Sequence, residues 1–527
     1  MKFNKQNTVE RQMESHPDAI QNYEGGLSFS VDPPTELYVQ TATCLVGEQK
    51  FYESTGFADQ ALITAAHRVL ATAPEFVLQL AVYCREQMHL RSVPLVLCAE
   101  YANMAPGTVP NARKYISKVI QRADELTEIL AYQFERNAIL PRKAKLPMAI
   151  KYGVRDAFPK FDPYQLSKYR GEGSGVSLKD ALFMTHPKPK DDNQQADWDN
   201  LIAGTLGTPI TWETQRSQGL MNWSEVIHIV FNKDGKIMNY MAQLRNLRNM
   251  MKSKDVSNPD LALVCKMLSD HDAVRRSKQL PFRFLTAYRT IRYGMWTERR
   301  GKYTIIHEGD KEVTEHPMIN SVLDALETAA AVSIENMQRL PGTTLIASDV
   351  SGSMFNRISK KSVVQRFDIG LMLGSMAHKI CDTSITGIFG DTWKPIPMSK
   401  HTGILPNVID MRDSEGEVGY STNGFKVMEY LLKNDIKVDR LMFFTDNQMW
   451  NSRHDVQFAP TFLKYQRRFP DVKLYLFDLS GYGNIVVPQD TKNACLVAGW
   501  SDRIFDFIEM NEQTGTNAID MIKAIKP

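Results

Sequence analysis

The chain has 527 residues, of which 43% are hydrophobic and 23% are charged. At roughly 150 residues per domain this length predicts two to four domains, and the composition excludes a collagen, a coiled-coil rod and a disordered chain. The 63 Lys and Arg residues nearly balance the 60 Asp and Glu residues, so the net charge of +3 does not by itself indicate a nucleic-acid-binding protein.

The N-terminal residues 1–15 are polar and lack the apolar core of a secretion signal. No stretch reaches the roughly 18 uninterrupted apolar residues that a membrane helix needs. The six cysteines are scattered without a Cys-x-x-Cys pair, which is typical of buried thiols in a reducing compartment. We therefore expect a soluble, cytoplasmic protein that makes no contact with a membrane.

Residues 1–23 are expected to form an N-terminal tail, and residues 24–340 carry apolar side chains at helical spacing. The helical segments come in short pairs separated by turns that contain proline, such as the turn before Pro74. This pattern predicts an irregular stack of antiparallel helix pairs of the HEAT-like kind. Two segments interrupt it: residues 171–175 are expected to be a flexible loop, and residues 187–200 a solvated connection.

Beyond residue 340 the pattern changes to strands that alternate with helices. This alternation predicts a mostly parallel sheet covered on both faces, so residues 341–527 should form a Rossmann-like α/β domain. The fold class is therefore multidomain, with an all-α helical-repeat region followed by an α/β domain. Strands are predicted at 345–347, 385–389, 441–444 and 474–477, and helices at 363–379 and 425–432.

A candidate metal site follows the first of these strands, in the sequence Ser-Asp-Val-Ser-Gly-Ser-Met at 348–354. In an open parallel sheet, ligands bind at the carboxyl ends of the strands. Asp349, Ser351 and Ser353 alternate, so their oxygen atoms can converge on one point. One carboxylate and two hydroxyls form a hard, oxygen-only ligand set that suits Mg²⁺.

Two later segments fit the same site. The loop at 419–424 precedes a helix and offers the hydroxyl of Ser421 or Thr422, and Asp446 ends the strand at 441–444. A lone Asp at a strand end is more often a helix cap, but three such segments at one sheet edge favour a shared metal site. No general base adjoins the motif, since His378 is expected on a helix surface. The motif therefore indicates binding rather than catalysis.

Basic residues cluster in two stretches of the helical region. Residues 142–190 hold eleven basic and four acidic side chains, residues 275–302 hold nine and one, and residues 341–527 hold 21 of each sign. Aromatic residues are interleaved with both clusters, and this combination suits phosphate binding with base stacking. The alternative is that a basic run is only a solvated face, and that aromatics at helical spacing such as Phe282, Phe284 and Tyr288 belong to the core.

Residues 24–527 resemble the Ro autoantigen, or TROVE-domain, RNA-binding proteins and their bacterial Rsr relatives. The stretch 341–527 is similar to von Willebrand factor A domains with a metal-ion-dependent adhesion site, through Asp-Val-Ser-Gly-Ser-Met at 349–354 and Phe-Thr-Asp-Asn at 444–447. The helical region is similar through LPMAIKYGVRDAF (146–158), FDPYQLSKY (161–169), LKDALFMTHPKP (178–189), MAQLRNLRNM (241–250) and QLPFRFLTAY (279–288).

The resemblance implies a ring of HEAT-like repeats closed by the A domain, in a monomeric protein that is part of a ribonucleoprotein. Small structured Y RNA would bind the basic outer surface, and single-stranded 3′ ends of misfolded RNA would enter the central hole, for RNA quality control. Mg²⁺ would be held by Asp349, Ser351 and Ser353, with Thr422 and Asp446 direct or through water. The implied outer-surface residues are Lys151, Arg155, Lys168, Arg170, His186 and Lys188, and the implied ring-lining residues are Arg245, Arg248, Arg283 and Arg289.

In bacterial relatives such a complex tethers an exoribonuclease, polynucleotide phosphorylase, which is therefore an expected partner. One departure from the family concerns Leu178, because vertebrate members have a histidine there, so contacts with Y RNA can differ at this point. The leading hypothesis is a non-catalytic RNA-binding protein. The alternative is a scaffold whose A domain binds a partner carboxylate through Mg²⁺. A Mg²⁺-dependent nuclease or phosphatase is the weakest hypothesis, because the motif supplies one Asp with hydroxyls rather than a carboxylate cluster.

Overall fold

The computed structural model describes residues 13, 15–44, 55–139, 146–169, 175–207, 211–229, 238–300, 303–359, 362–450, 457–501 and 503–527. The contacts within the chain divide it into two compact units. Unit 1 comprises Met1–Ala58 and Met221–Asn517, and unit 2 comprises Asp59–Leu220 and Ala518–Pro527. Each unit is thus built from two separate stretches of the chain.

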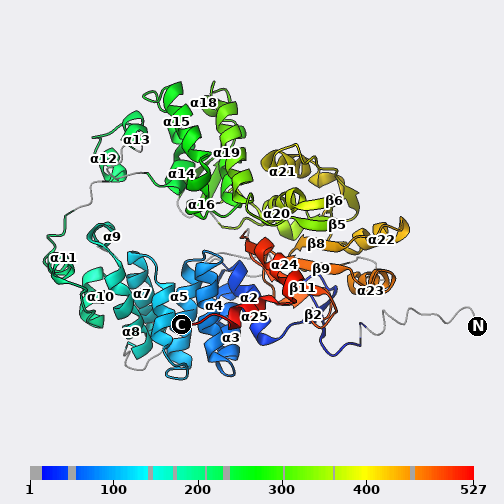
Figure 1. Ribbon diagram of the computed structural model, residues 1–527, viewed down its shortest axis with the longest axis horizontal. Helices are drawn as coiled ribbons and strands as arrows, with labels where there is room; N and C mark the ends of the chain where they lie inside the picture. The colour runs from blue at the N-terminus through cyan, green and yellow to red at the C-terminus, as the bar shows by residue number, and fades with distance from the viewer. Residues whose placement is uncertain are drawn as a thin grey trace, which may run out of the picture. The chain divides into compact units, whose positions relative to one another are not determined.

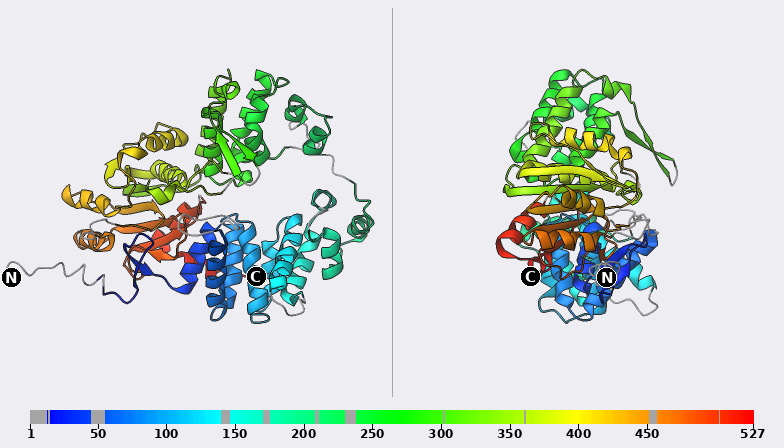
Figure 2. Two further views of the ribbon diagram at one scale, coloured as in Figure 1. Left: turned by 180° about the vertical axis from the view of Figure 1, so that it is seen from behind. Right: turned by 90° about the vertical axis from the view of Figure 1, so that its right-hand side faces the viewer.

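The described part of unit 2 is all-α. The helix α4 packs on both α5 and α6, α5 packs on α7, and α6 packs on α8, so neighbouring helices stand side by side (Figures 1 and 2). This arrangement confirms the predicted stack of helix pairs. The helices are α3 (Thr55–Leu70), α4 (Pro74–Glu86), α5 (Ser92–Met104), α6 (Ala112–Val119), α7 (Ala123–Ile139), α8 (Met148–Ala157), α9 (Pro163–Lys168), α10 (Leu178–Thr185), α11 (Asp192–Ala203), α12 (Trp212–Ser217) and α25 (Ala518–Lys523).

The expectation of a solvated connection at 187–200 was wrong, because α11 occupies most of it. Asp191 caps this helix by accepting a hydrogen bond from the Gln194 amide, and Gly204 ends it in the left-handed conformation. Trp198 is buried and packs edge-on against Phe158, with ring centroids 5.2 Å apart. The run of aspartates suggested a loop, but the buried side chains of Trp198 and Leu201 anchor a helix here.

The C-terminal residues dock on unit 2. Helix α25 packs against α4, and Gln79 of α4 donates hydrogen bonds to the carbonyl oxygens of Lys523 and Ile525 at 2.9 and 3.1 Å. Lys118 donates to the Lys526 carbonyl at 2.7 Å. Main-chain carbonyls of the C-terminal segment thus provide acceptors for side chains of the helical repeats.

Unit 1 contains a second set of helices between residues 221 and 333. Helix α17 packs against both α14 and α19, and a two-stranded antiparallel hairpin follows α17. The elements are α13 (Trp223–Ile229), α14 (Tyr240–Met251), α15 (Asn258–Leu268), α16 (His271–Ser277), α17 (Phe282–Arg292), β3 (Trp296–Arg300), β4 (Tyr303–His307), α18 (Lys311–Thr314) and α19 (Ile319–Ser333).

A six-stranded sheet forms the rest of unit 1, in the order β11-β9-β8-β5-β6-β7. All neighbouring pairs are parallel except β6 with β7. The strands are β5 (Leu340–Asp349), β6 (Cys381–Phe389), β7 (Trp393–Pro395), β8 (Arg440–Thr445), β9 (Lys473–Asp478) and β11 (Ala494–Ala498), and the helices are α20 (Arg366–Ile380), α21 (Ile404–Asp413), α22 (Phe425–Lys433), α23 (Phe458–Arg468) and α24 (Arg503–Thr514). All four predicted strands and both predicted helices are present.

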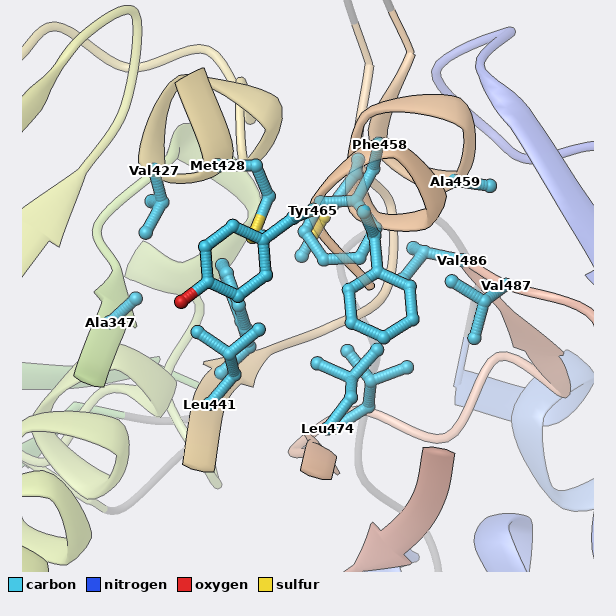
Figure 3. Packing of buried hydrophobic residues seen from close by; sticks show 14 of the residues in the cluster. Ala347, Val427, Met428, Leu441, Phe458, Ala459, Tyr465, Leu474, Val486 and Val487 are labelled. Atoms are coloured by element: carbon cyan, nitrogen blue, oxygen red, sulfur yellow. The ribbon is translucent and has the colours of Figure 1, made fainter. Parts of the chain in front are cut away.

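Alternate strand residues face opposite sides of this sheet, as period-2 geometry requires. Ala347, Leu441 and Leu474 pack with residues of α22 and α23, including Phe458 and Tyr465 (Figure 3). On the other face, Ile346 and Ser348 lie against α20 at Gly374, where an added Cβ would come within 3.1–3.3 Å of their side chains. Both faces of the central strands are therefore covered by helices.

The N-terminal residues join unit 1, although residues 1–23 were expected to form a tail. Strand β1 (Ala19–Gln21) pairs with β2 (Leu27–Ser30), and β2 pairs with β10 (Asn484–Ile485), while α2 (Pro33–Thr43) contacts β11. The change of fold class is present near residue 340, between the end of α19 and the start of β5. The compact units divide at residue 220 instead, because the helices at 221–333 cluster with the sheet.

Candidate functional site

The predicted metal-ligand residues come together at the carboxyl edge of the sheet. Asp349 ends β5, and Asp446 follows the last residue of the adjacent strand β8. The loop at 419–424 lies at the same edge, because the Gly352 amide donates to the Tyr420 carbonyl at 2.9 Å. The five predicted residues are all at most 4% exposed: Asp349, Ser351, Ser353, Thr422 and Asp446.

Short hydrogen bonds orient the first carboxylate. Asp349 accepts from the Ser351 amide at 2.9 Å on Oδ1 and from the Thr445 hydroxyl at 2.6 Å on Oδ2. The hydroxyl oxygens of Ser351 and Ser353 lie 3.3 Å apart. Three oxygen-bearing side chains are thus held in a small, buried volume. Thr445 was not predicted from the sequence, although its place directly before Asp446 at the strand end could have indicated it.

The second carboxylate is less well satisfied. Asp446 accepts on Oδ1 from the Gln448 amide at 3.0 Å, and among the described residues its buried Oδ2 has no hydrogen-bond partner. Burial raises the pKa of Asp349 to about 6 and that of Asp446 to about 7, and the negative charge of Asp349 raises the second pKa further. Two neighbouring buried carboxylates are unfavourable when both are ionised.

These residues fit a divalent cation. A cation would neutralise the two carboxylates, and the hydroxyls supply the further oxygen ligands that Mg²⁺ requires. Among the described residues, no group of three or more His, Cys, Asp or Glu side chains is placed to hold a metal, so the site depends on its hydroxyls. Thr422 is buried, whereas Ser421 is partly exposed and its amide donates to Asp391 at 2.8 Å. Burial therefore favours Thr422 over Ser421 as the hydroxyl ligand.

The first basic stretch gives unit 2 a surface on which some basic side chains are paired with carboxylates and others are not. Arg155 lies 4.4 Å over the Tyr152 ring and pairs with Asp156 at 3.0 Å, and Lys168 pairs with Glu213 at 2.9 Å. His186 and Lys188 are exposed beyond the end of α10, and Lys151 is half-buried. Within the described ranges, these three side chains have no carboxylate partner. Arg170 lies outside the described residues.

The aromatic residues of this stretch divide between core and surface. Phe158 and Phe161 are buried, which agrees with the alternative that they belong to the core. Tyr164 is exposed, and Tyr169 accepts a cation–π contact from Arg122 at 5.1 Å and a hydrogen bond from it at 2.8 Å. Tyr152, Tyr164, Tyr169 and the half-exposed Phe183 thus remain at the surface for stacking.

The four predicted ring-lining arginines have different environments in unit 1. Arg245 of α14 and Arg283 of α17 are exposed, and no carboxylate pairs with either in the part of the chain that the structure describes. Arg248 hydrogen-bonds Asp310 and lies 5.5 Å from the Trp296 ring centroid. Although the Arg283 side chain is exposed, the protein atoms around it lower its pKa by displacing water, and the positive charge of Arg245 lowers it further. The two like charges therefore act on each other.

Arg289 does not occupy a position where it could line an RNA path. It is 5% exposed, and its guanidinium donates to the Asp368 carboxylate at 2.7 Å and to the Val363 carbonyl at 3.2 Å. The structure contradicts its assignment as an RNA-binding residue, because the buried Asp368 requires its charge. Phe282, Phe284 and Tyr288 are buried as well, so the core explanation holds for all three.

None of the helices in the described residues is both long enough and apolar enough to cross a bilayer. The profile of the TROVE domain matches residues 38–201 and 189–295. Telomerase protein component 1 of Rattus norvegicus is 21% identical over 478 residues, covering 64% of this chain and 18% of that protein. Its counterpart in Mus musculus is 23% identical over 336 residues, covering 48% and 12%. The chain therefore matches less than a fifth of the length of either relative.

The crystal structure of the Deinococcus radiodurans Ro (Rsr) protein is also similar to this chain. It is 16% identical, has a TM-score of 0.55, and the match covers 89% of this chain and 97% of that chain. At this level of identity the likeness concerns the fold. It confirms the predicted fold class of helical repeats combined with an A-like α/β domain.

Proposed function

This chain belongs to the TROVE-domain family, and from that premise we propose that it is an RNA-binding protein of the Ro type that binds without catalysis. Members of this family bind RNA. The observation that carries the proposal for this chain is the exposed pair Arg245 and Arg283, which lack a carboxylate partner among the described residues. Two like charges that act on each other are stabilised by an external anion, and phosphate groups of RNA supply one.

The arginine pair suits single-stranded RNA. Planar guanidinium groups bind phosphate through paired hydrogen bonds and also stack on exposed bases. Arg283 itself lies 5.1 Å from the Phe282 ring centroid, so a cation and an aromatic ring are adjacent at this position of α17. We assign the 3′ ends of misfolded or decaying RNA to this surface, which in a closed ring of repeats would face the central hole.

The second RNA surface is formed by α8, α9 and the end of α10 in unit 2. Lys151, His186 and Lys188 would contact the phosphates of a small structured RNA of the Y type, and Arg155 stacked on Tyr152 presents a rigid planar cation. Lys168 would act more weakly, because Glu213 already neutralises it. Structured RNA is recognised mainly by shape and backbone, which a dispersed set of cations of this kind can do.

A titration of the full chain with two RNAs tests the proposal: a hairpin with a single-stranded 3′ tail, and the same hairpin with a blunt end. We expect tighter binding of the tailed RNA, and we expect the logarithm of the binding constant to fall linearly with the logarithm of the salt concentration. Absence of binding, or binding that does not depend on salt, would contradict the proposal. RNA shortened during incubation by protein free of contaminating nuclease would contradict its non-catalytic part.

A second function is favoured by the buried pair Asp349 and Asp446. Held with Mg²⁺, this site would leave a coordination position for an acidic group of a partner protein, and an exoribonuclease such as polynucleotide phosphorylase is the partner that the resemblance suggests. Under this alternative the helical repeats are a scaffold. The change Asp349→Ala separates the two functions, because RNA binding survives it in our proposal and partner binding does not.

A further inference from the structure

A cavity of about 590 Å³ opens between α14, α15 and α16 in unit 1, whose helices are neighbours in Figure 1. We infer that this cavity binds a single nucleotide, with the base inserted between apolar walls and the phosphate at a cationic rim. As a site on RNA, the inference rests on the RNA binding proposed above. The volume lies within the range of roughly 300–1,000 Å³ that small-molecule and nucleotide sites occupy.

The walls of the cavity suit the flat faces of a base. Met267 contributes a polarizable thioether side chain, and Tyr240 contributes an aromatic ring. The hydroxyl of Tyr240 donates to the Leu268 carbonyl at 2.6 Å, and its ring meets Phe284 edge-on with centroids 6.4 Å apart. These contacts fix the ring before any ligand arrives, so little side-chain freedom is lost on binding.

Gln243 provides the polar group that points to a specific ligand. Its side chain lines the cavity, is 5% exposed, and uses its Nε2 to donate to the Met238 carbonyl at 3.0 Å. Its Oε1 is buried and has no hydrogen-bond partner in the part of the chain that the structure describes. A buried acceptor of this kind is unfavourable until a donor reaches it. The amino and imino groups on base edges are donors, whereas the phosphodiester groups that link the nucleotides of RNA offer none.

The rim carries the charges that a nucleotide needs. Lys266 and Arg276 both line the cavity and are exposed, and neither pairs with a carboxylate within the described ranges. The preceding residue, Arg275, is instead bound to Glu335 at 2.6 Å, so the two adjacent arginines have different partners. Asp270 also lies at the rim and caps α16 through the Ala273 amide at 2.7 Å. Its negative charge would direct the phosphate toward Lys266 and Arg276.

Binding of the four nucleoside 5′-monophosphates to the full chain, measured by calorimetry and ligand-observed NMR, tests the site. Gln243→Leu removes the acceptor, and Arg276→Ala removes a rim cation without touching the core. We expect each change to weaken binding by about tenfold or more, as loss of one hydrogen bond to a charged or buried group implies. The controls are Arg275→Ala, which removes the paired neighbour, and Gln279→Leu, which removes another buried amide oxygen outside the cavity; both should bind like the unchanged protein.

Ribose 5-phosphate is the probe that lacks a base. Equal binding of ribose 5-phosphate and of the monophosphates, or unchanged binding by Gln243→Leu, would overturn the inference. An RNA carrying 4-thiouridine distinguishes RNA from free nucleotide as the ligand, because it should crosslink to Tyr240 or Met267 on irradiation. Monophosphate binding without this crosslink would assign the cavity to free nucleotides. If the protein binds RNA but no monophosphate, the inferred nucleotide site is wrong and the proposed function stands. If it binds monophosphates but no RNA, the proposed function is wrong.

Discussion

Arg289 of α17 donates a hydrogen bond across 2.7 Å to Asp368 of α20, and both side chains are buried. The same carboxylate accepts from the Gln365 amide at the start of α20 and is also bound by Arg412 of α21. A single carboxylate thus joins the helices before residue 340 to the helix that follows the candidate metal loop. An arginine placed by sequence among RNA-binding residues instead holds unit 1 together.

We predict that Arg289→Ala lowers the stability of unit 1 by about 3–5 kcal/mol, because it leaves a buried carboxylate short of one cation. Arg412→Ala should cost less, since Arg412 is partly exposed to water. Chemical denaturation followed by near-UV circular dichroism measures both changes. Arg275→Ala, which breaks an exposed ion pair, is the control. If Arg289→Ala lowers the free energy of unfolding no more than the control does, the structural role given to Arg289 is contradicted.

Divalent cations should stabilise the protein through the candidate metal site. At a Mg²⁺ concentration 100 times the dissociation constant, the expected gain is about 2.7 kcal/mol, seen as a rise in melting temperature that EDTA reverses. Asp446→Asn should abolish this response and should raise the stability of the metal-free protein, since it removes a like charge beside Asp349. Thr422→Val should weaken the response and Ser421→Ala should not. A response that survives Asp446→Asn would place the cation elsewhere.

His378 should make stability depend on pH. Burial and the nearby charges of Lys400 and Lys379 lower the pKa of His378 below its ordinary value of 6.5. As the pH falls below 6.5, the unfolded chain therefore takes up a proton that the folded protein excludes, and stability falls by at most about 1.4 kcal/mol for each pH unit. His378→Gln should flatten the stability profile between pH 6.5 and 5. An unchanged slope in that variant would show that other groups cause it.

Removal of residues 518–527 should loosen unit 2. Ala518 and Ile522 are buried against it, and Gln79 and Lys118 would lose their main-chain acceptors. Hydrogen exchange measured along α4 and α6 should become faster in the truncated protein. Lys526→Ala is the matched control, because Lys118 binds the carbonyl of that residue and not its side chain. Exchange as slow in the truncated protein as in the full chain would contradict the docking role of α25.

That Asp349 and Asp446 meet could be predicted from sequence because both lie at strand ends, and parallel strands place their carboxyl ends at one sheet edge. The RNA-binding residues could be predicted only in part. The family resemblance implied Arg245, Arg283 and Arg289 alike, whereas the structure shows that Arg289 is buried against Asp368 and that the first two are exposed. The pairing of β2 with β10 could not be predicted from the sequence either, since more than 450 residues separate the paired strands.

The central claim is that RNA binds at the Arg245 and Arg283 surface, and a filter-binding titration over a range of salt concentrations tests it most directly. The double change Arg245→Ala/Arg283→Ala should lower the magnitude of the salt slope by about 1.4 and weaken binding of 3′-tailed RNA roughly 25-fold at 0.1 M salt, as loss of two phosphate contacts implies. The charge-matched double change Arg275→Ala/Arg503→Ala should leave both values unchanged. Equal slopes and affinities for the two double variants would contradict the account.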